Sequence, residues 1–323
     1  MTAREAGSDE YAYEVMYLLD SAGDAAADEL TTKLRRLGDC VSVAGDGNGL
    51  WTIHVHCNDV GAAIEAGVQA GRPHRITVAR FADEAERVPT RFRRDRAVVV
   101  PVHGPGLAAL FRAEGAVVFE IADDADRDRD PDVWDLLDVI TSTGASQVTV
   151  LPGSVDLMAV ADEAAIRAVA AGQDVVVVPC ASPVQAMAAL AVHDPARRAG
   201  DDVVAMAEAA AATRRGEVTI AGQDAITWIG SCQADDVLGF VDGEVILIER
   251  GPSTPDTLAK AALGVARRML APGGELVTVV LGARAPDELG ETITEFLRRE
   301  HPEVEVGVYH GGGRGEVVRL GVE

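Results

Sequence analysis

The sequence predicts an α/β protein made of two successive parts, and three observations support this prediction. The chain has 323 residues, of which 48% are hydrophobic and 25% charged, enough for about two domains of ordinary composition. Residues 11–82 follow the order β-α-β-β-α-β. From residue 97 onward, short apolar runs alternate with helical segments, which is typical of a doubly wound parallel sheet.

The charge balance argues against two classes of partner. The chain carries 52 acidic and 29 basic residues, which gives a net charge of −23. A surface this negative repels phosphate backbones and anionic lipid headgroups, so we expect no nucleic-acid or membrane-surface binding. The sequence has no run of 18 apolar residues, so no membrane span is predicted either.

The cysteines and the N-terminus both indicate a cytoplasmic protein. The four cysteines form no CxxC pair and no recognisable disulfide framework, so we expect reduced thiols. Residues 1–10 are polar and acidic, without the basic and then apolar build of a signal peptide. We interpret them as a disordered lead-in.

The first part is predicted to be a ferredoxin-like unit over residues 11–82. The expected strands are Tyr11–Leu19, Cys40–Ala44, Leu50–His56 and Arg75–Phe81, and the expected helices are Asp24–Leu37 and Val60–Ala70. In this fold two helices cover one face of a four-stranded sheet. We expect the other face to be left free, and a homodimer would be one way to bury it.

Residues 83–96 are predicted to be a linker, because they contain Pro89 and five arginines and show no apolar period. Residues 97–323 follow as an α/β domain with two lobes, at about 97–195 and 217–323. Its first expected strands are Ala97–Val102, Val117–Ile121, Gln147–Leu151 and Asp174–Pro179. A helix from Asp201 to Arg215 is expected to lead into the second lobe.

The most specific local feature is His54-Val55-His56 on the third expected strand. Side chains alternate along a strand, so both imidazoles share one face. The ferredoxin-like order pairs this strand with the first, which places Glu14 on the same face. Two histidines and a carboxylate suit zinc or another divalent ion. Two exposed histidines without a metal are the alternative interpretation, and Cys57 and Asp59 are reserve ligands.

Three further segments lie where α/β proteins bind ligands. His103-Gly104-Pro105-Gly106 joins a strand to a helix, a turn that is either tight packing or an anion site. Ser154 and Ser182 follow two later strands and also suit helix N-caps. The charged segment 123–132 is expected to be a solvated loop, although a Mg²⁺ site there is conceivable.

These segments together resemble the fatty-acid-kinase A-type proteins of the dihydroxyacetone-kinase-like group. The resemblance covers the chain from about Tyr11 to its end and lies in the motifs Leu37–Gly45, Ile53–Gly61, His103–Leu107, Val150–Ser154, Val178–Ala186, Arg215–Thr219 and Tyr309–Gly312. It implies a ferredoxin-like middle domain, followed by a DegV-like domain with a doubly wound parallel sheet and a second α/β lobe.

The resemblance also implies a division of labour. The family's N-terminal helical domain binds ATP with an aspartate-rich Mg²⁺ motif, and no D-G-D-T-G-like motif occurs here, so no ATP site and no catalytic residue are expected in this chain. The family's middle domain holds zinc through the equivalents of His54 and His56 and a cysteine whose position is Glu14 here. The C-terminal domain docks a separate DegV-type fatty-acid-binding protein.

Three functions are compatible with these features. The first is a scaffold portion of a fatty-acid kinase, which presents a carrier-bound acyl chain to the missing N-terminal kinase domain. The second is direct binding of a fatty acid or another small ligand by the C-terminal domain, for which His103 replaces the family's serine. The third is a metal hydrolase at Glu14, His54 and His56, with Asp59 as the nearest candidate base.

Overall fold

The computed structural model describes residues 11–20, 23–45, 49–80, 92, 94–121, 132–313 and 315–323. The chain folds into two compact units. The first unit takes in the described parts of residues 1–99, 133–181 and 188–211, and the second takes in those of residues 100–132, 182–187 and 212–323. The expected linker and the expected lead-in fall largely outside the described residues, as does most of the charged segment 123–132.

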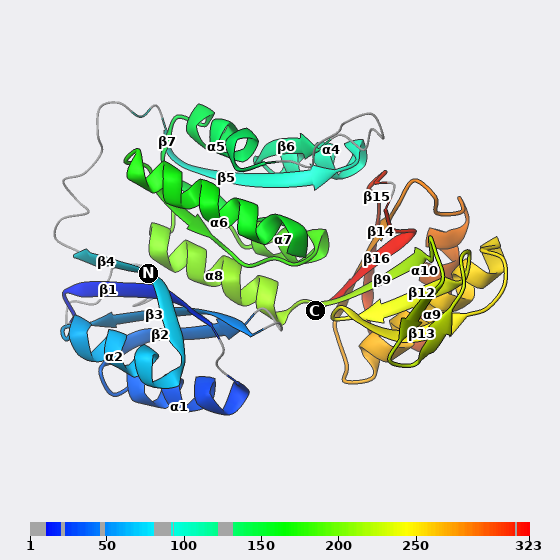
Figure 1. Cartoon of the computed structure of the whole chain (residues 1–323), viewed down its shortest axis with the longest axis horizontal. Helices are drawn as coiled ribbons and strands as arrows, with labels where there is room; N and C mark the ends of the chain where they lie inside the picture. Colours follow the sequence, from blue (N-terminus) through cyan, green and yellow to red (C-terminus); the bar gives the residue numbers. More distant parts are fainter. Residues whose placement is uncertain are drawn as a thin grey trace. The chain divides into compact units, whose positions relative to one another are not determined.

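The first unit begins with a four-stranded antiparallel sheet and two helices. Its elements are β1 (Tyr13–Asp20), α1 (Asp24–Leu34), β2 (Gly38–Gly45), β3 (Leu50–Cys57), α2 (Val60–Ala70) and β4 (Arg72–Arg80). The strand order is β2-β3-β1-β4, with β1 antiparallel to both neighbours (Figure 1). The ferredoxin-like arrangement that the element order predicted is therefore present.

Alternation along β1 separates the small sheet into two faces. Val15, Tyr17 and Leu19 are buried against the two helices, together with residues from β3. The Tyr17 hydroxyl reaches the carbonyl oxygen of Ala63 in α2 at 3.1 Å, which satisfies the phenol within this core. The opposite set of β1 side chains, including Glu14, therefore points away from the helices.

The prediction that this second face is free is wrong. Glu14, Met16 and Leu18 are only 8%, 8% and 6% exposed. Helix α8 (Ala199–Ala212) packs over the face, and the Ser42 hydroxyl donates a hydrogen bond of 2.8 Å to Glu208 on that helix (Figure 1). The cover comes from a segment more than a hundred residues away, so local patterning gave no sign of it. A homodimer is therefore not needed to bury this face.

A second, four-stranded sheet follows the order β6-β5-β7-β8. It comprises β5 (Arg94–His103), β6 (Val117–Ile121), β7 (Ala145–Val150) and β8 (Asp174–Val177). The helices between these strands are α4 (Pro105–Ala113), α5 (Val133–Ser142) and α6 (Val155–Ala170), and α7 (Pro183–Ala191) follows β8. β7 is parallel to both β5 and β8. Strand β5 begins at Arg94, three residues earlier than the apolar run alone suggests, because pairing with β7 extends into the polar segment.

The second unit contains a six-stranded mixed sheet in the order β13-β12-β9-β16-β14-β15. Its strands are β9 (Arg214–Ile220), β12 (Val237–Val241), β13 (Glu244–Glu249), β14 (Leu276–Leu281), β15 (Glu305–His310) and β16 (Val318–Val322). Helices α9 (Pro255–Leu270) and α10 (Leu289–Glu300) bury their apolar faces in one core with this sheet. A separate hairpin consists of β10 (Ala225–Thr227) and β11 (Gly230–Cys232). No described helix is long and apolar enough to cross a membrane.

A buried carboxylate fixes the segment that leads into α8. Asp202 is 2% exposed; its Oδ2 lies 2.6 Å from Nδ1 of His193, and its Oδ1 accepts a hydrogen bond from the amide of Asp194. Truncation of Asp202 would leave these donors unsatisfied in a buried place. Helix α8 is thereby fastened at its first turn.

We expect Asp202→Ala to destabilise the first unit by about 3 kcal/mol, the usual cost of breaking a buried charged pair. The measurement is the midpoint of urea unfolding followed by circular dichroism. Asp156→Ala removes an exposed acidic residue from the first turn of α6 and is the matched control, with an expected change below about 0.5 kcal/mol. Equal shifts in the two variants would contradict the fastening role.

Candidate metal centre

Glu14, His54 and His56 lie together on the face of the small sheet that α8 covers. The antiparallel register sets Glu14 opposite His56 and Met16 opposite His54. All three functional side chains therefore project from one face, on two neighbouring strands. His54 and His56 are each 1% exposed. The site is thus an interior one.

Both imidazoles turn their Nε2 atoms toward Glu14. His54 Nε2 lies 2.9 Å from Glu14 Oε1, and His56 Nε2 lies 3.7 Å from the same oxygen. The two rings are arranged edge to face, with centroids 4.7 Å apart and planes at 80°. Three potential ligand atoms therefore converge on one small volume.

The other nitrogen of each ring faces an oxygen acceptor. His54 Nδ1 lies 2.9 Å from the backbone carbonyl oxygen of Cys40, and His56 Nδ1 lies 3.6 Å from Asp39 Oδ1. Histidines that bind metals usually donate their second N–H to such groups, which orients the ring. For His54, oxygen atoms therefore face both ring nitrogens.

A fourth residue joins the group, and the sequence reasoning missed it. Asp201, at the beginning of α8, has its Oδ1 3.8 Å from His56 Nε2. Glu14, His54, His56 and Asp201 can each offer one ligand atom, and these atoms all lie within 4.8 Å of one another. An acidic residue in the first turn of a helix is common, because it suits the helix dipole, so its sequence position alone signals nothing special.

Glu14 is held ionised despite its burial. Burial raises the pKa of its carboxyl group, but the hydrogen bonds and positive charges of His54 and His56 outweigh this, and the pKa falls to about 2. A carboxylate that stays charged inside the protein requires positive charge beside it. Protons on the imidazoles or a bound cation can supply that charge.

The donor set suits a divalent ion, and most of its spacing is close to that of ligands around one. Ligands about 2.0–2.2 Å from a tetrahedral ion lie roughly 3.3–3.6 Å from one another. The His56 Nε2 distances to Glu14 Oε1 and Asp201 Oδ1, 3.7 and 3.8 Å, are close to that separation. His54 Nε2 and Glu14 Oε1 are closer, at the hydrogen-bond distance of 2.9 Å, and would have to move apart to share an ion. Two imidazoles and two carboxylates are suitable ligands for Zn²⁺ and also for Mn²⁺ or Fe²⁺.

The two reserve ligands lie elsewhere. Cys57 is fully buried in the core between the small sheet and its helices, on the face opposite the histidines. Asp59 is the N-cap of α2, and its carboxylate accepts a hydrogen bond from the Ala62 amide. Asp59 is therefore engaged in capping, and the general base that a hydrolase would need is not supplied by it.

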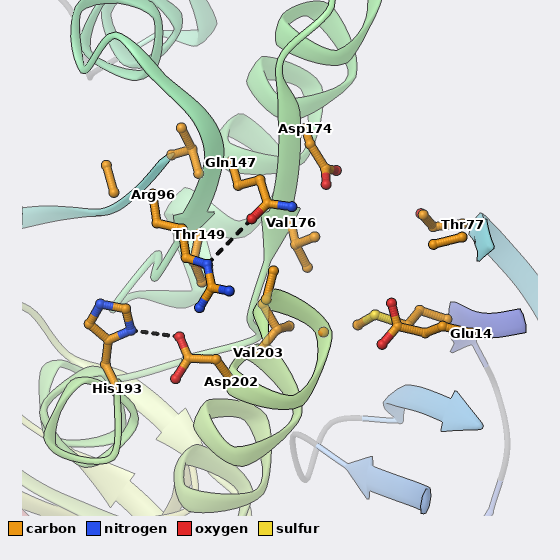
Figure 2. A pocket seen from close by; sticks show the side chains of 16 residues that line it. Glu14, Thr77, Arg96, Gln147, Thr149, Asp174, Val176, His193, Asp202 and Val203 are labelled. Atoms are coloured by element: carbon orange, nitrogen blue, oxygen red, sulfur yellow. Dashed lines mark hydrogen bonds and ion pairs between the residues drawn. The ribbon is translucent and has the colours of Figure 1, made fainter. Parts of the chain in front are cut away.

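A cavity of about 60 Å³ adjoins the site within the first unit (Figure 2). Glu14 enters it from β1, while Arg96 and Gln147 enter from the parallel sheet and form a hydrogen bond of 3.4 Å (Figure 2). The His193–Asp202 pair lines the same cavity. Its lining is mixed, and a few water molecules would fill it.

The backbone of a distant segment occupies the position where an anion would bind at the turn after His103. In the second unit, the amides of Gly106 and Leu107 donate to the carbonyl oxygen of Gly311 at 3.0 and 3.1 Å. These are the donors that an anion at the beginning of α4 would use. A cavity beside Leu107 and Gly311 has a volume of only about 10 Å³, room for one water molecule at most. This cavity is too small for an anion or an acyl chain.

The two serines also have local roles. Ser154 is the N-cap of α6, and its hydroxyl accepts a hydrogen bond from the Asp156 amide at 3.3 Å. Ser182 is buried just before α7, and its carbonyl oxygen accepts from the Gln185 and Ala186 amides. Gly104 adopts φ +92°, which explains the glycine at that position.

The fold and the site define a two-part α/β protein whose small sheet carries a buried histidine–carboxylate group. Comparison with known families identifies two domains along the chain: the middle domain of the fatty acid kinase A-like (FakA-like) family matches residues 10–88, and the C-terminal domain of the same family matches residues 97–323. The chain belongs to the FakA-like family.

Individual relatives are distant. The protein YloV of Bacillus subtilis is 25% identical over 312 residues, which are 92% of this chain and 54% of that protein. The dihydroxyacetone kinase of C. freundii, solved with AMP-PNP and Mg²⁺, shares the fold at a TM-score of 0.50 and 12% identity, covering 76% of this chain and 50% of that one. The fatty acid kinase B3 protein of Streptococcus pneumoniae, loaded with linoleic acid, has a TM-score of 0.48 and 10% identity, covering 71% and 99%.

Proposed function

We propose that this chain is the metal-holding and partner-docking portion of a fatty acid kinase A-like protein. The observation that carries the proposal is the match of both family domains in order along the chain. The chain spans about half the length of the curated relatives that it matches. Phosphoryl transfer is assigned to a kinase domain outside this chain, and the docked partner to a DegV-type fatty-acid-binding protein.

The metal in this proposal has a structural role. Glu14, His54 and His56 would hold zinc or another divalent ion. The ion would link β1 to β3 on the face of the small sheet that α8 covers. The site is buried, so a substrate would have no ready access to it, and Asp59, the base considered for a hydrolase, caps a helix. These features favour a structural ion over a hydrolytic one.

The β10–β11 hairpin supports the docking part of the proposal. Ile226 on β10 is 91% exposed, and Trp228 in the turn is 72% exposed, which leaves large apolar side chains bare in a chain of net charge −23. Exposed apolar patches on soluble domains often mark contact surfaces, and tryptophan is prominent among residues that dominate binding energy. We assign this hairpin to the contact with the DegV-type protein.

The test is a calorimetric titration of the chain with the DegV-type protein of the same organism, loaded with a fatty acid. We expect saturable binding, and we expect Trp228→Ala to weaken it by about 30-fold, the usual effect of losing a central aromatic anchor. Trp134→Ala removes another exposed tryptophan, on α5 and packed beside Arg167, and serves as the matched control. Absence of binding by the unsubstituted chain would overturn the docking proposal.

A further inference from the structure

We propose that Asp201 is the fourth ligand of the metal and that the ion fastens helix α8 to the small sheet. The inference rests on the proposed metal site, to which it adds a residue from a different part of the chain. Three ligands come from β1 and β3, whereas Asp201 stands at the first turn of α8. A shared ion would therefore join the middle domain to the domain that follows it.

The charges around His56 give the first reason. Carboxylate oxygens of Glu14 and Asp201 lie 3.7 and 3.8 Å from the same nitrogen, His56 Nε2. One N–H group can serve one of these acceptors well but not both. A divalent ion between the three atoms would satisfy both negative charges and accept the nitrogen lone pair at once.

The state of Asp201 gives the second reason. Its side chain is 14% exposed, and its Oδ2 atom is buried with no hydrogen-bond partner among the described residues. A buried carboxylate oxygen without a donor is costly, and such atoms often mark the place of an ion or a water molecule. An ion held by Asp201 would remove that cost.

The packing of α8 gives the third reason. A Cβ atom at Gly200 would lie 1.8 Å from Glu14 Oε1, so the helix reaches the carboxylate because this position has no side chain. Ser42 and Glu208 hold the helix on the same face further along, at 2.8 Å. Asp201 is thus presented to the ligand group by a helix seated directly on it.

The test compares metal affinity among variants of the full chain, measured by competition with a chelating dye for Zn²⁺ and for Mn²⁺. Loss of a group that merely orients a ligand costs about 10–100-fold in affinity. We therefore expect Asp201→Ala, which removes a ligand, to raise Kd by roughly 100-fold or more. Glu208→Gln weakens another contact between α8 and the sheet and should leave Kd unchanged.

A second measurement tests whether the metal holds helix α8 on the small sheet. We expect added Zn²⁺ to slow amide hydrogen exchange in the first turns of α8 in the unsubstituted chain and in Glu208→Gln, but not in Asp201→Ala. Asp201→Asn keeps the shape of the side chain and should show the same loss in weaker form, which guards against a folding defect in the alanine variant.

The outcomes separate the two proposals. If His54→Ala leaves the metal affinity unchanged, the metal site itself is wrong. If His54→Ala removes binding while Asp201→Ala and Asp201→Asn both behave like Glu208→Gln, the site stands and the role of Asp201 is overturned. In that case Asp201 is only an acidic residue that suits the beginning of a helix.

Discussion

The paired substitution His54→Ala and His56→Ala is expected to abolish metal binding and to lower the stability of the small domain. Both imidazoles are almost fully buried and their Nε2 atoms converge on Glu14, so no surface group can replace them. With free metal at about 100 times Kd, a bound ion adds about 2.7 kcal/mol to the free energy of unfolding. The variant should lose this increment together with the metal.

Elemental analysis after purification and thermal unfolding with and without a chelator provide the measurement. We expect about one metal ion per unsubstituted chain, a fall in its unfolding temperature on chelation, and no response of the variant to the chelator. His301→Ala, which changes a half-buried histidine in the second unit, is the control. A variant that retains its metal content would show that the ligands lie elsewhere.

Gly106→Ala is expected to destabilise the second unit by about 3 kcal/mol, the upper range for forcing extra atoms into a packed core. Helix propensity predicts the opposite sign, because alanine is favoured over glycine in a helix by about 0.8–1 kcal/mol. However, a Cβ atom at Gly106 would lie 1.7 Å from the backbone carbonyl oxygen of His310. To relieve this clash, α4 would have to move away from the backbone at the end of β15.

Urea unfolding followed by circular dichroism measures this effect, and Gly222→Ala is the matched control because its Cβ would meet nothing within 4 Å. We expect the control to change the unfolding midpoint little. A stabilised Gly106→Ala variant would mean that Gly106 and the His310 carbonyl oxygen are not in the close contact described. It would also reopen the amides of Gly106 and Leu107 as an anion site.

Patterning within short segments predicted much of this protein. Alternation in His54-Val55-His56, together with the β-α-β-β-α-β order, predicted that both imidazoles share a face with Glu14. This inference succeeds because side chains alternate with a period of two along a strand. In addition, few strand orders are compatible with a β-α-β-β-α-β chain.

Contacts between distant segments could not be predicted in this way. Asp201 looks like an ordinary first-turn acid, and only the packing of α8 brings it to 3.8 Å from His56. The same packing covers the face that was expected to be free. At the other candidate site, Gly311 returns from β15 and its carbonyl oxygen takes the amides of the glycine turn.

The sequence by itself determined the family, the α/β class, the facing of the two histidines and the acidic surface, because each depends on residue type and local period. Tertiary structure alone decided which carboxylates surround those histidines, that the site is buried, and that the turn at His103 is closed. The physical reason is that burial and close approach depend on which surfaces pack together. That choice is made by the whole chain rather than by any one segment of it.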